Sequence, residues 1–71
     1  MKISARNQLK GTVKSIETGS VNAIVHIDIG NGNGNVISST ISIDAVKELG
    51  LAVGKEAYAI IKATSVMVGV E

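Results

Sequence analysis

Residues 21–29, VNAIVHIDI, decide the fold class, because apolar side chains recur at every second position. One face of this stretch carries Val21, Ala23, Val25, Ile27 and Ile29, and the other carries Asn22, Ile24, His26 and Asp28. Successive side chains of a β-strand point to opposite faces of its sheet, so a strand with one buried face shows this alternation. The stretch therefore predicts a half-buried strand and an all-β fold.

The segment before this strand has the same alternation with one break in it. Residues 9–13, LKGTV, alternate, but the next apolar residue is Ile16. Because one extra residue reverses the alternation of a strand, we expect a bulge or bend near Lys14 and Ser15. Residues 18–20, TGS, then predict a turn.

A run of glycine and asparagine, GNGNGN at residues 30–35, separates this strand from the next one at 36–43. Both residue types tolerate positive φ angles, so the run predicts a hairpin loop. It is superficially similar to a phosphate-binding glycine loop, but it lacks the third glycine of G-x-G-x-x-G and no helix follows it. We therefore attach no nucleotide-binding role to it.

The period of the apolar residues changes in the C-terminal half of the chain. Residues 44–50, DAVKELG, predict one or two turns of helix, which Asp44 caps and Gly50 ends. Residues 56–61 and 66–70 predict the last two strands. Three strands, a short helix and two strands follow each other in this order in OB folds. We expect a five-stranded OB-like barrel with one short helix between the third and fourth strands.

The size and composition of the chain favour an oligomer. Its 71 residues make one small domain. A domain of this size buries only about 60% of its unfolded surface, so disulfides, a metal or oligomerisation usually add stability. The chain has no Cys and one His, whereas 45% of its residues are hydrophobic. Residues 56–61 are apolar on both faces, which implies that another subunit covers the outer face.

The composition argues against nucleic-acid and membrane partners. The formal net charge is +1 and Tyr58 is the one aromatic residue, whereas single-strand binding needs a basic groove and aromatic platforms. No apolar run approaches the roughly 20 residues that a membrane span needs, and we expect no signal peptide. The lack of Cys is compatible with a cytoplasmic location.

No group of residues has the spacing of a catalytic or cation-binding site. His26 and Asp28 share one face of a predicted strand, and we interpret them as a solvated or subunit-facing polar pair. The six acidic residues are scattered along the chain. We therefore expect neither an enzyme nor a set of metal-cation ligands.

Hydrogen-bond donors without neighbouring carboxylates gather in two segments. Residues 4–8, SARNQ, precede the first acidic residue, Glu17, and residues 62–65, KATS, form a second donor group. Ser42 adds a hydroxyl near the start of the predicted helix, whose free N–H groups favour anions. A tetrahedral dianion needs convergent N–H and O–H donors and one or two cations. A polar arm, a solvated lysine and a helix cap remain as structural alternatives.

These segments give the chain a resemblance to the molbindin family over essentially its whole length. The residues that carry it are 4–13, SARNQLKGTV; 49–51, LGL, with Gly54 and Lys55; and 61–66, IKATSV. Molbindins are small molybdate-binding proteins built from the Mop domain, and the resemblance is close to the clostridial members. It implies a single Mop domain over residues 1–71.

The resemblance also implies an assembly and a set of binding residues. The assembly that the resemblance implies is a hexamer, a trimer of dimers, with oxyanion sites at subunit interfaces. The oxyanion-binding residues that it implies are Ser4, Ala5, Arg6, Ser42, Lys62 and Ala63. A secondary oxyanion site near the threefold axis is implied for Gly19, Ser20, Val21 and Asn22. Ala45 departs from the pattern, because regulators of the family can offer a hydroxyl there.

The function expected on these grounds is cytoplasmic binding and storage of molybdate or tungstate, with no organic cofactor. Arg6 and Lys62 would neutralise the dianion, while hydroxyl and amide groups satisfy its oxygens. The sequence leaves open the preference among molybdate, tungstate and sulfate, and also the binding of a pterin form of molybdenum. The alternative is a small oligomeric protein-interaction module without a small-molecule ligand.

Overall fold

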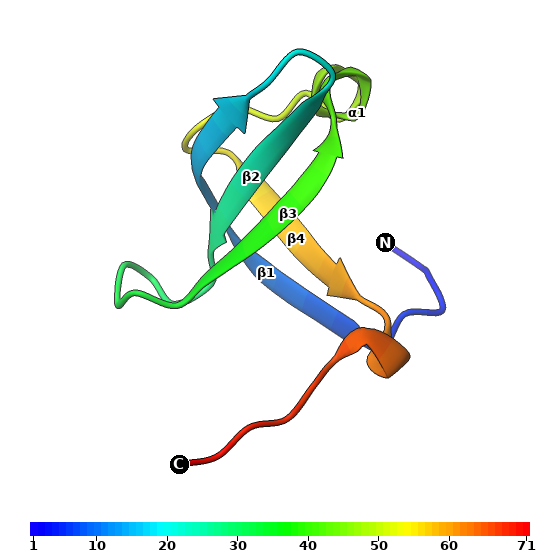
Figure 1. Cartoon of the computed structure of the whole chain (residues 1–71), viewed down its shortest axis with the longest axis vertical. Coiled ribbons are helices and arrows are strands. Elements are labelled where there is room, and N and C mark those ends of the chain that lie inside the picture. Colours follow the sequence, from blue (N-terminus) through cyan, green and yellow to red (C-terminus); the bar gives the residue numbers. More distant parts are fainter.

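Four antiparallel strands form one curled sheet, in the order β3-β2-β1-β4, in the computed structural model, which describes residues 1–71 (Figure 1). The strands are β1 (Asn7–Thr18), β2 (Asn22–Asp28), β3 (Val36–Ser42) and β4 (Glu56–Ile61). The helix α1 (Ile43–Glu48) follows β3, and a 3-10 turn, η1 (Ala63–Ser65), follows β4. The fold is therefore all-β with one short helix, and the sheet curls into half of a barrel.

The longest strand, β1, joins the two halves of this sheet. Its first part pairs with β4, from Asn7 opposite Ile61 onward, and its second part pairs with β2. The register with β2 shifts between Val13 and Ser15, which confirms the predicted bulge. A bulge bends a strand and increases its twist, so β1 can serve both halves of the half-barrel.

The alternating stretch supplies most of the core. Ala23, Val25 and Ile27 of β2 are buried, as the alternation predicts, and Val13 and Ala59 complete the buried set. Gly11 allows β1 to approach β2 closely, because a Cβ at this position would collide with the backbone oxygen of Asp28. The core thus lies on the concave side of the sheet, where β1, β2 and β4 meet.

The N-cap of the helix lies two residues earlier than the sequence indicates. Ser42, and not Asp44, is its N-cap, because the Ser42 Oγ accepts a hydrogen bond from the Ala45 amide at 3.0 Å. Asp44 lies in the first turn, where its charge suits the positive end of the helix dipole. Gly50 follows the helix with a φ of 63°, a conformation that glycine adopts readily, and it ends the helix as predicted.

The expected fifth strand is absent, and this corrects the predicted strand count. After η1 the chain leaves the sheet and runs outward to the C-terminus (Figure 1). Met67, Val68 and Val70 are 93%, 92% and 95% exposed. The composition of residues 66–70 suits a strand, but β2 and β4 already occupy both edges of β1, and η1 directs the tail away from the remaining edges. One chain therefore forms a half-barrel whose concave face stays open.

Candidate functional site

The N-terminal arm, residues 1–6, lies against the start of β1 and forms a shallow polar cavity there. The cavity has a volume of about 410 Å³ and is lined by Ile3, Ser4, Ala5, Arg6 and Gln8. The Gln8 Nε2 donates a hydrogen bond to the Ala5 carbonyl at 2.9 Å, which holds the arm in a bend. The Ser4 hydroxyl and the Arg6 guanidinium lie on exposed residues of this bend.

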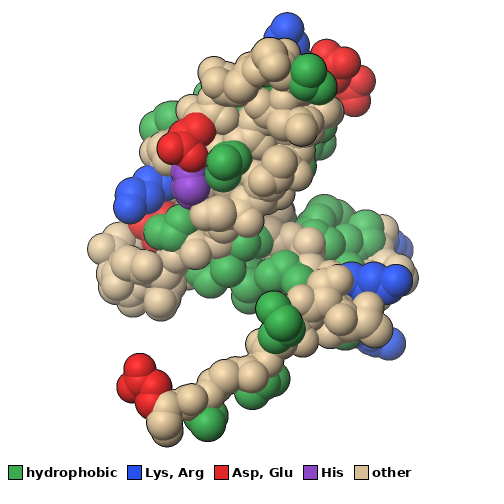
Figure 2. Space-filling view, viewed as in Figure 1, with side chains coloured by type: hydrophobic (Ala, Val, Ile, Leu, Met, Phe, Trp, Pro, Cys, Tyr) green, Lys and Arg blue, Asp and Glu red, His purple; other side chains and the backbone are tan.

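Strand pairing brings the second donor segment to the same end of the sheet. Asn7, the first residue of β1, pairs with Ile61, the last residue of β4, and its Nδ2 donates to the Ile61 carbonyl at 3.1 Å. Arg6 and Lys62 are the next residues on either side of this pair. The structure thus places the arm beside η1, and Figure 2 shows Lys and Arg side chains grouped at this end of the molecule.

The positive charges at this end have no acidic partner. The Glu56 carboxylate lies 3.3 Å from Lys10 and the Glu17 carboxylate lies 3.0 Å from His26, so neither contact includes Arg6 or Lys62. The Ser65 and Val66 amides donate the hydrogen bonds of η1. The N–H groups of Ala63 and Thr64 take no part in these bonds. This end of the chain offers cations and amide donors together, the combination that binds an oxyanion.

Ser42 lies at the other end of the sheet, away from this donor cluster (Figure 1). It pairs with Asn22 across β3 and β2, and the Ile43 amide donates to the Val21 carbonyl at 2.9 Å. Within one chain, Ser42 therefore lies beside the residues expected for the secondary site. It lies away from Ser4 and Arg6. The residue pattern alone does not indicate this grouping, which depends on the register of β2 and β3 that places Asn22 opposite Ser42.

The residues expected for the secondary site form the turn between β1 and β2. The Gly19 amide donates to the Asn22 carbonyl at 2.8 Å and closes this turn. Gly19, Ser20, Val21 and Asn22 are all exposed. They form a surface with backbone groups and one hydroxyl but no cation of their own.

The single histidine has other partners than the expected one. Its Nδ1 lies 2.8 Å from the Ser38 Oγ and its Nε2 lies 3.0 Å from the Glu17 Oε2, so it bridges β1, β2 and β3. Asp28 instead accepts a hydrogen bond from the Gly30 amide at 2.9 Å. This bond, with a second one from the Gly32 amide, lowers the pKa of Asp28 below its ordinary range. The expected pairing of His26 with Asp28 is therefore wrong.

The bridge made by His26 has the residue types of a hydrolytic triad but not its surroundings. Neither His26 nor Glu17 lines any of the three surface cavities, so no enclosed space for a substrate adjoins them. No group of three or more His, Cys, Asp and Glu side chains is placed to hold a metal cation. We interpret the bridge as a structural link between three strands.

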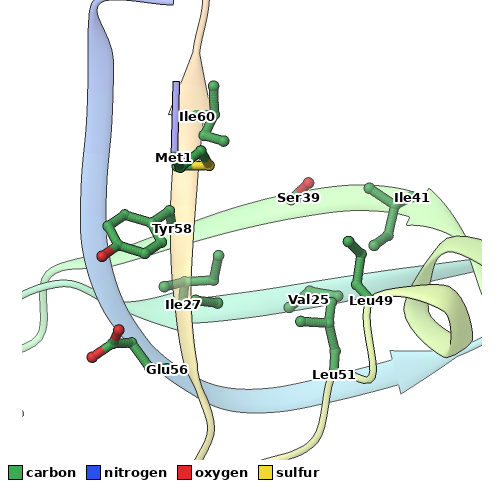
Figure 3. Close-up of a pocket in the computed structure, with 11 residues that line it drawn as sticks. Met1, Val25, Ile27, Ser39, Ile41, Leu49, Leu51, Glu56, Tyr58 and Ile60 are labelled. Atoms are coloured by element: carbon green, nitrogen blue, oxygen red, sulfur yellow. The ribbon is translucent and has the colours of Figure 1, made fainter. Parts of the chain in front are cut away.

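The open concave face of the half-barrel is apolar. A cavity of about 410 Å³ lies on it, and nine of its eleven lining residues are hydrophobic. Figure 3 shows Tyr58 and Ile60 of β4 on one side of this cavity and Ile41, Leu49 and Leu51 on the other. The open concave face is thus an apolar recess.

The structure contains no helix with the length and apolar character of a membrane span.

Comparison with known sequences shows the family. The model of the TOBE domain matches residues 3–68 of the chain. A Haemophilus influenzae protein named "Probable molybdenum-pterin-binding protein" is 83% identical over 71 residues, with 100% of both chains covered. The Clostridium pasteurianum protein named "Molybdenum-pterin-binding protein 1" is 50% identical over 68 residues, which cover 96% of this chain and 97% of that protein.

Comparison with solved structures agrees with the sequence matches. MopII from Clostridium pasteurianum, in an apo form, has a TM-score of 0.86 and 48% identity, with 97% of this chain and 100% of that chain covered. ModG, described as a cytoplasmic molybdate-binding protein and solved with molybdate bound, has a TM-score of 0.89 and 49% identity. The match to ModG covers 100% of this chain and 49% of ModG. The chain therefore belongs to the TOBE-domain family, as a Mop-type (molbindin) member close to the clostridial proteins.

Proposed function

We propose that this protein binds molybdate, and tungstate as its close analogue, and stores it reversibly in the cytoplasm. The observation that carries the proposal is that the pairing of Asn7 with Ile61 brings the polar cavity lined by Ser4 and Arg6 to the end of the sheet where Lys62 follows β4. The names of the relatives, which refer to molybdenum and molybdate, support the choice of anion.

The chemistry of the cluster suits a dianion. Arg6 and Lys62 neutralise two negative charges, the Ser4 hydroxyl donates one hydrogen bond, and the backbone amides of Ala5 and Ala63 donate others. No Asp or Glu occurs in residues 1–16 or 57–70, so no carboxylate of these segments repels the anion. Binding needs no bond to break, which makes capture and release reversible.

We propose that the anion site is completed between subunits of a homo-oligomer, a hexamer built as a trimer of dimers. Ser42 lies at the opposite end of the sheet from Arg6 in its own chain, so it reaches an anion held by Arg6 only from a second copy. The apolar concave cavity and the exposed residues 66–70 support the assembly, because burying both removes a large apolar surface from water. The turn formed by residues 19–22 is the proposed secondary oxyanion site.

We propose that no organic cofactor is bound. A pterin ring binds best against an aromatic platform, and the one aromatic side chain, Tyr58, lines the apolar concave cavity and not the cavity at the arm. The same apolar cavity supports the second candidate function, a protein-interaction module without a small ligand. The two candidates differ in whether the free anion binds.

Titration calorimetry of the purified protein with molybdate, tungstate and sulfate tests the proposal. We expect Arg6→Ala to weaken molybdate binding at least about tenfold, because charge-assisted hydrogen bonds are worth roughly 1.5–3 kcal/mol. Lys14→Ala removes the same charge from the middle of β1 and is expected to leave the affinity unchanged. Absence of heat with every anion, or equal affinity of Arg6→Ala and the unaltered protein, would contradict the proposal.

A further inference from the structure

The hairpin loop between β2 and β3, residues 30–35, has no part in the proposed anion site, yet it carries a reactive pattern. Asn31-Gly32 and Asn33-Gly34 are two Asn-Gly pairs in succession. The backbone nitrogen that follows an Asn can attack the carbon of the Asn side-chain amide, and glycine hinders this attack least because it has no Cβ. We propose that Asn31 and Asn33 are sites of spontaneous deamidation, which converts this uncharged loop into an acidic one.

The reaction needs water and no other reactant. The glycine nitrogen loses its proton and bonds to the Asn Cγ, and the Nδ2 group leaves as ammonia, which closes a five-membered succinimide ring. Water then opens the ring at either of its two carbonyl groups and gives aspartate or isoaspartate. Each conversion adds one negative charge, so the first takes the formal net charge from +1 to zero and the second to −1.

The loop has the freedom that ring closure requires. Residues 31–35 are exposed, and a Cβ at Gly32 or at Gly34 would meet no atom within 4 Å. One backbone bond, from the Ile29 amide to the Asn35 carbonyl at 2.9 Å, closes the base of the loop, and one at 3.2 Å, from Asn33 to Gly30, crosses it. Rotation about the backbone of Asn31 therefore disturbs few contacts, whereas the Asn33 side chain packs against Gly30, where a Cβ would collide with its Oδ1.

The other three asparagines provide internal controls. Asn7 and Asn22 lie in strands and precede Gln8 and Ala23, whose Cβ atoms hinder attack. The Asn7 Nδ2 is also bonded to the Ile61 carbonyl. Asn35 precedes a β-branched residue, Val36. These three are expected to stay intact while the loop reacts.

Peptide mapping by mass spectrometry of the folded full-length protein, sampled during incubation at neutral and mildly alkaline pH, tests this inference. The loop peptide is expected to gain the mass of an NH2-to-OH exchange at Asn31 and Asn33, faster at the higher pH. Asn33→Ser should confine the change to Asn31, and Asn31→Ser should confine it to Asn33. The chain unfolded in urea gives the reference rate. The inference is overturned if the folded loop stays intact while the unfolded loop reacts, or if Asn7 or Asn22 converts as fast as Asn33.

Discussion

Very few side chains hold the interior of this chain together. Five of its 71 residues are buried, and Val13 and Val25 are the largest of those that are fully buried. We expect Val25→Ala to lower the free energy of unfolding by about 2 kcal/mol, through lost burial and a residual cavity. Val21→Ala removes the same groups from a side chain that is 68% exposed, and a change below about 0.5 kcal/mol is expected. Urea unfolding at one protein concentration measures the free energy of unfolding of both variants. Equal losses for Val25→Ala and Val21→Ala would disprove the assignment of Val25 to the core.

Asp28 gives the stability of the hairpin a defined dependence on pH. The Gly30 amide, and next the Gly32 amide, hold the pKa of Asp28 below its ordinary range. A carboxyl group with a lowered folded pKa stabilises the fold above its unfolded pKa, and this stability is lost as the pH falls through the folded pKa. Asp28→Asn should therefore lower the melting temperature at neutral pH, with a difference that shrinks in acid. A difference that stays constant across an acid pH series would rule out this role.

The residues of the candidate site were predictable from the sequence, whereas their arrangement was only partly so. Ser4, Arg6 and Lys62 stand out because no carboxylate lies near them in the sequence. Their proximity depends on the pairing of Asn7 with Ile61, which is a contact between residues 54 positions apart. The position of Ser42 relative to these residues was not predictable in this way, since its hydroxyl caps a helix at the other end of the sheet.

Among the elements, α1 depends most on a single side chain. The helix has six residues, none of them buried, and the Ser42 Oγ accepts the Ala45 amide at its start. Ser42→Ala is expected to reduce the free energy of unfolding by about 1 kcal/mol, which chemical denaturation measures. Ser42→Asp should restore the stability, because Asp caps a helix as well as Ser. A Ser42→Ala protein as stable as the unaltered chain would refute the capping role.

The elements that the sequence predicts best are those set by local pattern. The alternation of residues 21–29 predicts β2, the change of parity predicts the bulge near Lys14 and Ser15, and the Gly-Asn run predicts the hairpin loop. Residues 66–70 have an equally suitable composition but form no strand. Whether a strand forms depends on an available partner edge, and composition carries no information about which edge lies within reach.

The shape of the whole molecule predicts self-association through the C-terminal tail and the open concave face. Val68 is 92% exposed, so Val68→Asp should have little effect on the fold of one chain. If the tail is buried between subunits, the same change places a charge in an apolar interface and should convert the oligomer into smaller species. Sedimentation velocity at micromolar protein concentration distinguishes the intact oligomer from the smaller species. An unchanged sedimentation coefficient for Val68→Asp would remove the tail from the interface.

We propose that one molybdate lies between the Ser4–Arg6 arm and the turn that begins at Lys62. A crystal structure of the protein with molybdate, with data collected near the molybdenum absorption edge, locates the anion. We expect an anomalous peak within hydrogen-bonding reach of the Ser4 hydroxyl, the Arg6 guanidinium and the Lys62 ammonium, with Ser42 of a second copy on its other side. A peak found only at the turn of residues 19–22, or no peak in a crystal grown with excess molybdate, would contradict it.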